Sequence, residues 1–318
     1  MNDSADSGRL DGRVALVSGA GRGVGLAIAR TLAAQGAKVV VADAGGAING
    51  EDPDASVAET VANELGDSAV AFTNSIADAG AAQAAVALAN EAFGGLDILV
   101  NNAAILRDGF IFKADPADFD AVLQTNLAGA WYLTNAATPT MRQHAKDNRG
   151  GAPYNWGRVV NITSTAGFYG NFGQSAYASA KSGMLGLMRT TAMDLARAGI
   201  TCNAVAPFAA TRVTDTIVPA NDEQAVYKER ALKVSPDHVA MVVAWLCSPK
   251  GQDITGQLFG VRGREVFLFS QPRPVATLAR DDADWDVTAL SEAAAENFSA
   301  LYTDLRTDLE VFNTDPKV

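Results

Sequence analysis

The chain has 318 residues, of which 48% are hydrophobic and 19% are charged. These values are near the averages of folded soluble proteins, so the composition excludes a disordered, collagen-like or coiled-coil chain. Acidic side chains number 36 against 25 basic ones, and the formal net charge of −11 has the wrong sign for a protein that holds a nucleic-acid backbone. We therefore expect a globular protein without a nucleic-acid partner.

Cysteine and histidine are sparse, so the sequence predicts no metal site and no disulfide framework. Cys202 and Cys247 lack the CxxC spacing, and His144 and His238 stand alone. The first residues lack the basic and then apolar pattern of a secretory signal, no apolar run reaches about 18 residues, and the final NTDPKV is not a peroxisomal signal. We expect a soluble, cytoplasmic protein with no membrane association.

Short apolar runs alternate with longer stretches of helical pattern. Continuous β-branched runs are typical of strands buried on both faces, and the intervening stretches, such as Val24–Gln35, Asp78–Phe93, Pro116–Ala145 and Ala176–Ala198, are long enough for crossover helices. The pattern predicts an α/β fold with a Rossmann-type, doubly wound parallel sheet. Its seven expected strands are Arg13–Gly19, Lys38–Asp43, Val70–Asn74, Leu96–Asn101, Arg158–Thr163, Ile200–Pro207 and Gln257–Gly263.

No linker or repeat interrupts this pattern, so residues 10–265 are expected to form a single dinucleotide-binding domain. Beyond it, Gln271–Pro274 and the acidic stretch Asp281–Asp286 predict a loop, and a helical pattern runs from about Ser291 to Leu309. We expect residues 266–318 to be a C-terminal extension that consists of a loop and a helix.

A glycine-rich turn, Ser18-Gly19-Ala20-Gly21-Arg22-Gly23-Val24-Gly25, separates the first expected strand from the first helix. Glycines at these positions allow a tight turn, close approach of the backbone to a pyrophosphate, and packing of the helix on the strand. The alternative is a strand-to-helix turn that only needs a positive φ. No GxxxxGK[ST] motif occurs, which excludes a P-loop ATPase.

An acidic residue, Asp43, ends the second expected strand, close to where a ribose-binding carboxylate belongs. A carboxylate there accepts hydrogen bonds from the adenosine 2′-OH and repels a 2′-phosphate, so NAD is the expected cofactor. Arg22 argues for NADP, because a guanidinium in this turn could reach a 2′-phosphate, but the repulsion at Asp43 should outweigh an exposed attraction.

Tyr177 and Lys181 are spaced four residues apart at the start of an expected helix that Ser175 could cap. On one helix face their side chains can interact, and a nearby ammonium lowers the pKa of a phenol from about 10, so that it can serve as a general base or acid. The alternative is an amphipathic helix with a half-buried Tyr and a Lys that extends to solvent.

Two further polar residues stand at informative places. Ser164 follows the fifth expected strand, at the sheet edge where α/β proteins bind ligands, and could donate a hydrogen bond to a reacting oxygen. Thr163 and Thr165 flank it, so the hydroxyl could be one residue away. Asn126 lies in the middle of an expected helix, where it is a poor helix former, and surface exposure is the alternative explanation.

These motifs, together with Asn101-Asn102-Ala103-Ala104, resemble the short-chain dehydrogenase/reductase family in order and spacing over residues 10–265. The resemblance implies that Tyr177 is the acid/base, that Ser164 polarises the substrate oxygen, that Lys181 lowers the Tyr pKa and binds the nicotinamide ribose, and that Asn126 holds a water of a proton relay. It implies a homodimer or homotetramer. The cofactor-binding residues are then expected to be Gly19, Arg22, Gly23, Val24, Gly25, Asp43, Ile76, Asn102, Ala103, Tyr177, Lys181 and Pro207.

Further segments resemble the 3-hydroxyacyl-CoA dehydrogenase part of peroxisomal multifunctional enzyme type 2: Asp43–Gly46, Ile105–Asp108, Tyr169–Gln174 and Trp245–Cys247. This resemblance implies an NAD-dependent oxidoreductase that acts on a 3-hydroxyacyl-CoA or a 17β-hydroxysteroid. Two alternatives remain: an NADPH-dependent 3-oxoacyl carrier-protein reductase, and a catalytically silent nucleotide-sensing protein, although the latter should lack Ser164, Tyr177 or Lys181.

The segments expected to contact the substrate are rich in apolar side chains, which suit an acyl chain or a sterol better than a sugar. These side chains are Phe110, Phe112, Phe168, Phe172, Phe208 and Ile217, and the candidate cations for a CoA moiety are Arg107, Arg212 and Lys228. The chain departs from the family pattern at Phe208, where a glycine is usual, and at Arg262-Gly263-Arg264, where many relatives have Asp-Gly-Gly. The departure at Phe208 puts the shape of the nicotinamide-side loop in doubt. The departure at Arg262-Gly263-Arg264 puts the subunit contacts in doubt.

Overall fold

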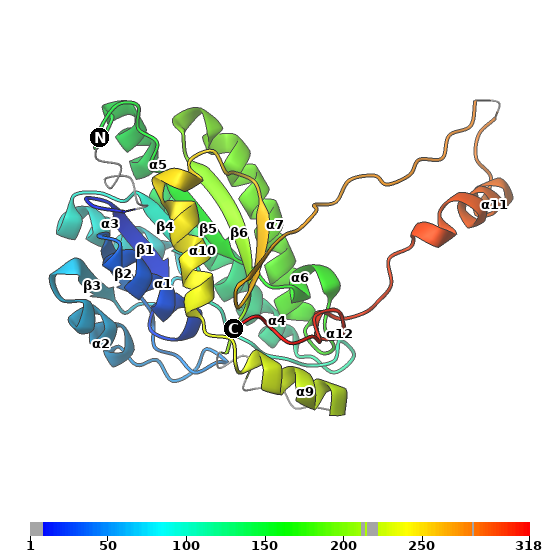
Figure 1. The fold of residues 1–318 in the computed structure, drawn as a ribbon, viewed down its shortest axis with the longest axis horizontal. Coiled ribbons are helices and arrows are strands. Elements are labelled where there is room, and N and C mark those ends of the chain that lie inside the picture. Colours follow the sequence, from blue (N-terminus) through cyan, green and yellow to red (C-terminus); the bar gives the residue numbers. More distant parts are fainter. Residues whose placement is uncertain (1–8, 211–213, 215–221, 282) are drawn as a thin grey trace.

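A computed structural model describes residues 9–210, 214, 222–281 and 283–318. Arg212 and Ile217 lie outside the described residues. The centre of the protein is an eight-stranded sheet with the strand order β3-β2-β1-β4-β5-β6-β7-β8 (Figure 1). The strands are β1 (Val14–Ser18), β2 (Lys38–Ala42), β3 (Ala69–Phe72), β4 (Ile98–Asn101), β5 (Arg158–Ile162), β6 (Thr201–Phe208), β7 (Leu258–Arg262) and β8 (Glu265–Leu268).

The expected doubly wound parallel sheet is confirmed, but seven strands were one too few. Strands β1 to β7 are parallel, and β8 pairs antiparallel with β7. A tight turn at Gly263, whose φ is +59°, joins the two. Because β8 alternates partly buried residues with the exposed Val266 and Leu268, it lacks the continuous apolar run that marks a buried strand.

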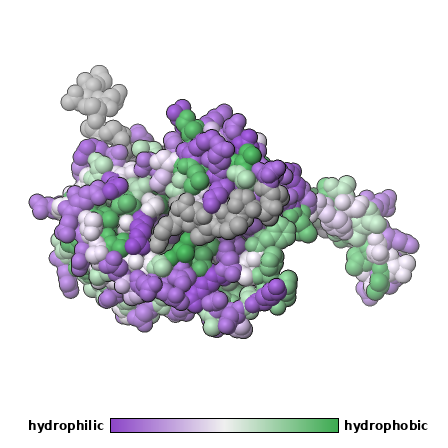
Figure 2. Space-filling view, turned by 90° about the horizontal axis from the view of Figure 1, so that it is seen from below, coloured by the Kyte–Doolittle hydropathy of each residue, from purple (hydrophilic) through white to green (hydrophobic). Residues whose placement is uncertain are grey.

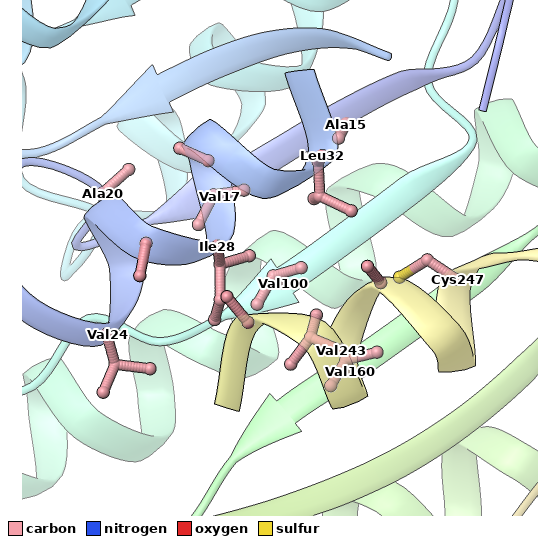
Figure 3. Close-up of a cluster of buried hydrophobic side chains, with 14 of the residues drawn as sticks. Ala15, Val17, Ala20, Val24, Ile28, Leu32, Val100, Val160, Val243 and Cys247 are labelled. Carbon is pink, nitrogen blue, oxygen red and sulfur yellow. The ribbon is translucent and has the colours of Figure 1, made fainter. Parts of the chain in front are cut away.

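Helices cover both faces of the sheet. On one face, α1 (Gly23–Ala34), α2 (Ser56–Leu65) and α10 (Asp237–Cys247) pack on the strands, and on the other lie α3 (Ala79–Phe93), α5 (Gly129–Asp147) and α7 (Ser175–Leu195). Val24, Ile28 and Leu32 follow one face of α1 at a spacing of four residues and meet α10 and the strands (Figure 3). The apolar stripes of the sequence thus form two cores that hold the carboxyl ends of the strands in place.

The remaining helical elements are short and lie at the ends of the sheet or beyond it. They are α4 (Pro116–Leu123), α6 (Ala166–Tyr169), α9 (Asp222–Ala231), α11 (Val287–Asn297) and α12 (Asp308–Val311), with single turns at Gly66–Ser68, Ala196–Ala198, Pro249–Gly251 and Ser299–Leu301. The expected helix Pro116–Ala145 is divided into α4 and α5 by a π-helical turn, Gln124–Ala128.

The C-terminal extension differs from the expected single helix over Ser291–Leu309. The helical segment ends earlier, as α11, residues 302–306 form neither helix nor strand, and α12 forms separately. Figure 1 shows α11 projecting far from the sheet, whereas α12 returns to it. The projecting part bears exposed apolar side chains such as Val287 and Leu305 among hydrophilic ones (Figure 2).

A buried polar cluster lies at the opposite end of the sheet from these strand ends. Asp97, fully buried, accepts hydrogen bonds from Arg149 (2.5 Å), the Tyr154 hydroxyl (3.1 Å) and the backbone N–H of Val14 (3.0 Å). Burial acts to raise the pKa of this carboxyl, but His144, Arg149 and the Val14 N–H more than offset it, so the pKa lies below its ordinary value. The cluster ties β1 and β4 to the loop before β5.

Candidate active site

A cavity of about 1120 Å³ opens at the carboxyl ends of the parallel strands. Its wall includes residues that follow β1, β2, β4, β5 and β6, which is where open α/β sheets bind ligands. All twelve residues expected to bind the cofactor line this cavity, as does Ser164. Asn126 alone, among the predicted site residues, does not.

The glycine-rich turn leaves no room for side chains. Gly19 has a φ of +64°, and a Cβ there would lie 2.8 Å from the Cα of Ala103. A Cβ at Gly25 would lie 2.0 Å from the carbonyl oxygen of Gly19. Positive φ therefore explains Gly19, and also Gly23 at +53°, but only close packing explains Gly25. The turn is a cradle of bare backbone at the N-terminus of α1, which fits the pyrophosphate of a dinucleotide.

Asp43 and Arg22 both lie beside this turn. The Asp43 carboxylate accepts hydrogen bonds from the backbone N–H groups of Gly21 and Gly45, each at 2.7 Å. One guanidinium nitrogen of Arg22 donates to the carbonyls of Gly45 (3.2 Å) and Gly46 (3.1 Å). The carboxylate is thus fixed at the end of β2, and the guanidinium is held by the loop that follows it.

Asn102 ties the end of β4 to the glycine-rich turn. Its amide nitrogen donates to the carbonyls of Ser18 and Gly19, both at 3.0 Å. The Ser18 hydroxyl accepts in turn from the backbone N–H groups of Asn102 (3.0 Å) and Ala103 (3.2 Å). This use of Ser18 was not predicted, because a serine before a glycine turn carries no distinct sequence signal.

Tyr177 and Lys181 project from the first turns of α7 into the cavity and are both buried. The helix begins at Ser175 itself, so Ser175 does not cap it, and the preceding Gln174 makes no side-chain cap either. The Lys181 Nζ lies 5.6 Å from the centre of the Tyr177 ring and donates a hydrogen bond to the carbonyl oxygen of Ile162 at 2.8 Å. The Ser164 side chain acts on the Tyr177 phenol in the direction that lowers its pKa.

The hydroxyl next to Tyr177 is that of Ser164, not that of either flanking threonine. The Thr163 hydroxyl donates to the carbonyl oxygen of Lys181 at 2.7 Å. The Thr165 hydroxyl donates to the carboxylate of Asp308. Both threonine hydroxyls therefore donate to groups other than Tyr177.

The sequence predicts that Lys181 lowers the pKa of Tyr177. With the groups of the protein alone, this prediction is wrong. Burial raises the pKa of this phenol to about 12, the Ser164 side chain opposes the rise, and the negative charges of Asp108 and Asp308 add to it. Burial also lowers the pKa of Lys181 to about 8. Desolvation outweighs the attraction between the two side chains because both lie in the interior and the ammonium is directed at a carbonyl oxygen.

Asn126 is buried within the π-helical turn and is not exposed at the surface. Its amide oxygen accepts from the backbone N–H of Ile105 at 2.8 Å, and its amide nitrogen donates to the Ile105 carbonyl at 2.9 Å. A π-turn widens the helix locally and is frequent at functional sites. Here it directs a paired amide onto the segment that follows β4.

Beyond the glycine-rich turn, the cavity wall carries both apolar side chains and polar ones such as Asp108, Asn171 and Gln174. Phe110, Phe172, Phe208 and Leu309 line the cavity, whereas Phe112 and Phe168 do not. Arg107, a candidate cation, donates to the carbonyl of Asn49 and pairs with Asp118 at 2.9 Å. Its charge is therefore already balanced in part by a carboxylate.

The residues at both departures from the family pattern contact the C-terminal segment. The ring centre of Phe208, at the end of β6, lies 4.7 Å from that of Phe312. Arg262 donates to the carbonyl of Phe312 (2.6 Å) and to the hydroxyl of Thr314 (3.0 Å), and Gly263 pairs with Lys317 in a β-bridge. This segment brings Asp308 and Leu309 into the cavity wall. The helical pattern of the tail does not show where the tail returns; only the family resemblance suggests that such an extension helps cover the active site or a neighbouring subunit.

Within the described ranges, no group of three or more His, Cys, Asp or Glu side chains is placed to hold a metal ion. In the same part of the chain, no helix is both long enough and apolar enough to span a bilayer.

Comparison with known proteins supports the resemblance seen in the motifs. The family model for short chain dehydrogenase matches residues 13–224. The hydroxyacyl-CoA dehydrogenase ChsB1 of Mycobacterium tuberculosis is 38% identical over 91% of this chain and 90% of its own length. Peroxisomal multifunctional enzyme type 2 of Drosophila melanogaster is 39% identical over 80% of this chain and 39% of its length. The crystal structure of 3-ketoacyl-(acyl-carrier-protein) reductase from Brucella melitensis complexed with NADH has a TM-score of 0.70 and 30% identity, covering 80% of this chain and 98% of that one.

Proposed function

Because the chain belongs to the short-chain dehydrogenase family, we propose that it is an NAD-dependent dehydrogenase of 3-hydroxyacyl-CoA or 17β-hydroxysteroid substrates. As a member, it is an oxidoreductase that acts on CH–OH groups. The observation that carries the proposal of an active dehydrogenase is the meeting of Ser164, Tyr177 and Lys181 in the same cavity as the glycine-rich turn. A catalytically silent nucleotide sensor would not need these three groups together.

The cavity residues divide the chemistry between them. NAD, when bound, supplies the hydride acceptor for alcohol oxidation and its reduced form the donor for ketone reduction. The Tyr177 phenol takes or gives the proton of the substrate oxygen, and the Ser164 hydroxyl steadies that oxygen as its charge changes. The Lys181 ammonium, when it is protonated, stabilises the phenolate form of Tyr177. Asn126 acts at a distance, by holding the segment at Ile105 that borders the cavity.

The choice of cofactor rests on Asp43. Its carboxylate stands in the cavity wall beside the glycine-rich turn, where it favours a free ribose hydroxyl and opposes a 2′-phosphate. Gly19, Gly23 and Gly25 would hold the pyrophosphate, and Asn102, Ala103, Ile76, Val24 and Pro207 the remainder of the cofactor, with Lys181 and Tyr177 at the nicotinamide ribose.

The substrate class follows from the wall and from the relatives. Phe110, Phe172, Phe208 and Leu309 offer an apolar surface that suits an acyl chain or a sterol skeleton. The named dehydrogenases among the relatives act on hydroxyacyl-CoA or belong to multifunctional peroxisomal enzymes. A sugar would leave its hydroxyl groups without partners against these side chains.

A direct assay tests this proposal. The protein is incubated with NAD⁺ or NADP⁺ and a panel of 3-hydroxyacyl-CoA thioesters and 17β-hydroxysteroids, and reduced cofactor is followed by its absorbance at about 340 nm. We expect turnover of at least one panel member with NAD⁺. Absence of turnover for both classes, in protein that binds NADH, contradicts the proposed substrates.

A second candidate is an NADPH-dependent 3-oxoacyl carrier-protein reductase. Arg22 favours it, because this guanidinium lies on the same loop as Asp43 and could contact a 2′-phosphate. Fluorescence titration with NADH and NADPH separates the two. Tighter binding of NADPH than of NADH contradicts the inference that Asp43 selects NAD, and it favours the reductase.

We also propose that the chain forms a homodimer or homotetramer, as expected from the family. The helices that carry Asn126 and Tyr177 would form the contact, and the apolar side chains exposed on the projecting part of the extension, such as Val287 and Leu305, are suited to a further one. Light scattering on a sizing column decides, since a monomer at micromolar concentration contradicts association.

A further inference from the structure

The C-terminal extension places a buried carboxyl group in the active-site cavity. Asp308 begins α12 and is 8% exposed, and it lines the same cavity as Ser164, Tyr177 and Lys181. One carboxylate oxygen accepts from the Thr165 hydroxyl and the other from the backbone N–H of Leu309, at 3.0 Å. The side chain is therefore held in place by two donors and is not a solvated surface acid.

The position of Asp308 is fixed by the elements around it. Thr307 and Glu310 form a capping box at the start of α12, in which Glu310 accepts from the Thr307 backbone at 2.7 Å. Downstream, Phe312 packs on Phe208, and Arg262 holds the Phe312 carbonyl. These contacts on both sides of Asp308 prevent the carboxyl group from turning out of the cavity.

Thr165 connects this carboxyl group to the proposed catalytic residues. It follows Ser164 directly in the chain, and Ser164 lines the same cavity as Tyr177 and acts to lower the pKa of its phenol. The hydrogen bond from Thr165 to Asp308 thus joins the extension to the strand end that presents the reacting hydroxyl. The charge of Asp308 also acts on the Tyr177 phenol, in the same direction as that of Asp108 at the rim.

We propose that Asp308 is a positioning residue of the active site, whose carboxylate fixes the segment that carries Ser164 through the hydrogen bond from Thr165 and places a negative charge in the cavity that Tyr177 lines. This inference rests on the proposed role of Tyr177. It gives the C-terminal extension a part in acid/base chemistry: a protonated phenol is ready to donate to a ketone, and oxidation of an alcohol requires its deprotonation.

Other charged and titratable groups face the same region. Around Asp308 these are Tyr169 on α6, Tyr227 on α9, Asp304 in the extension, and Arg262 on β7, whose charge acts on Tyr227. Burial raises the pKa of Asp308 and its hydrogen bonds oppose that rise. The carboxyl group nevertheless ionises at a lower pH than the phenol, whose pKa is about 12. Its charge is therefore present when Tyr177 titrates.

The test replaces the charge while keeping the shape. In Asp308→Asn, the phenol should lose its proton about half a pH unit to one unit lower than in the wild type. At a fixed pH below the pKa, the rate of alcohol oxidation should rise by about threefold to tenfold. The phenolate absorbance near 295 nm, taken as the difference from Tyr177→Phe between about pH 10 and 12, reports the same shift without turnover.

Two further variants separate the charge from the packing. Thr165→Val removes the hydrogen bond but leaves the carboxylate, so the phenol should titrate close to the wild-type pH while turnover falls. Asp315→Asn removes an exposed carboxylate of the same segment, one that pairs with Arg230, and should change neither property. An unshifted phenol titration in Asp308→Asn overturns the inference whatever the activity, whereas a shifted titration without turnover of any substrate contradicts only the proposed function.

Discussion

Replacing Lys181 by Met should make the protein more stable at pH 7 while removing its activity. The ammonium is 2% exposed and has no carboxylate partner among the contacts of its side chain in the described residues. Burial lowers its pKa from 10.5 to about 8. Lys181 is therefore a charge that the fold holds at a cost, which is typical of residues kept for function.

The size of the effect follows from the shift in pKa. A lowering of about 2.5 pKa units corresponds to about 3 kcal/mol in favour of the unfolded state at pH 7, where the side chain is charged in both states. Met removes this cost and also the hydrogen bond to the Ile162 carbonyl, which contributes about 1 kcal/mol. The net gain in the free energy of unfolding should be about 2 kcal/mol.

The sign of the pH dependence distinguishes this explanation from better packing alone. Between pH 8 and 10.5 the unfolded wild type binds more protons at this position than the folded one, so the contribution of Lys181 becomes less unfavourable as the pH rises. Urea unfolding of wild type and Lys181→Met, followed by tryptophan fluorescence, should give a large difference at pH 7 that nearly vanishes at pH 10. A variant that is less stable at pH 7, or a difference that is equal at both pH values, would refute the reasoning.

Two other variants test the glycine-rich turn and the buried polar cluster at the opposite end of the sheet. Gly25→Ala should weaken NADH binding at least about tenfold, because its Cβ would lie 2.0 Å from the Gly19 carbonyl oxygen. Fluorescence titration with NADH measures the affinity. The control variant Gly186→Ala, whose Cβ would meet nothing within 4 Å, should bind NADH normally. Equal affinities of the two variants would show that the turn tolerates a side chain. Asp97→Asn should lower the free energy of unfolding by about 3 kcal/mol at pH 7, because it leaves the partly buried Arg149 without its anion. Since the pKa of Asp97 is lowered by folding, the loss measured by urea unfolding should shrink below about pH 4; a loss that is independent of pH contradicts it.

The sequence predicted the parallel sheet and its ligand-binding edge well, because continuous apolar runs and the turns between them are local signals. The glycine-rich turn, Asp43, Ser164 and Tyr177 fall at strand or helix ends, and parallel strands bring such ends together. Residues whose role depends on distant contacts were less accessible. Asp308 enters the cavity only because Phe208 and Arg262 hold the returning tail.

Electrostatics was the part that sequence reasoning missed. The spacing of Tyr177 and Lys181 predicts mutual attraction, but it does not reveal that both side chains are desolvated or that Asp308 adds a negative charge. Likewise, the helical pattern around Asn126 did not reveal the π-turn that directs its amide to Ile105. Both properties depend on burial and on backbone geometry, which only the folded structure provides.

Substitution of Tyr177 by Phe tests the central claim most directly. The change removes one oxygen atom from the cavity and leaves the glycine-rich turn intact, so NADH should bind with nearly the wild-type affinity. Turnover of the best substrate should fall at least about a hundredfold, because the group that exchanges the proton is gone. Turnover close to that of the wild type, measured on the same protein with normal NADH binding, would contradict the assignment of Tyr177 and with it the proposed chemistry.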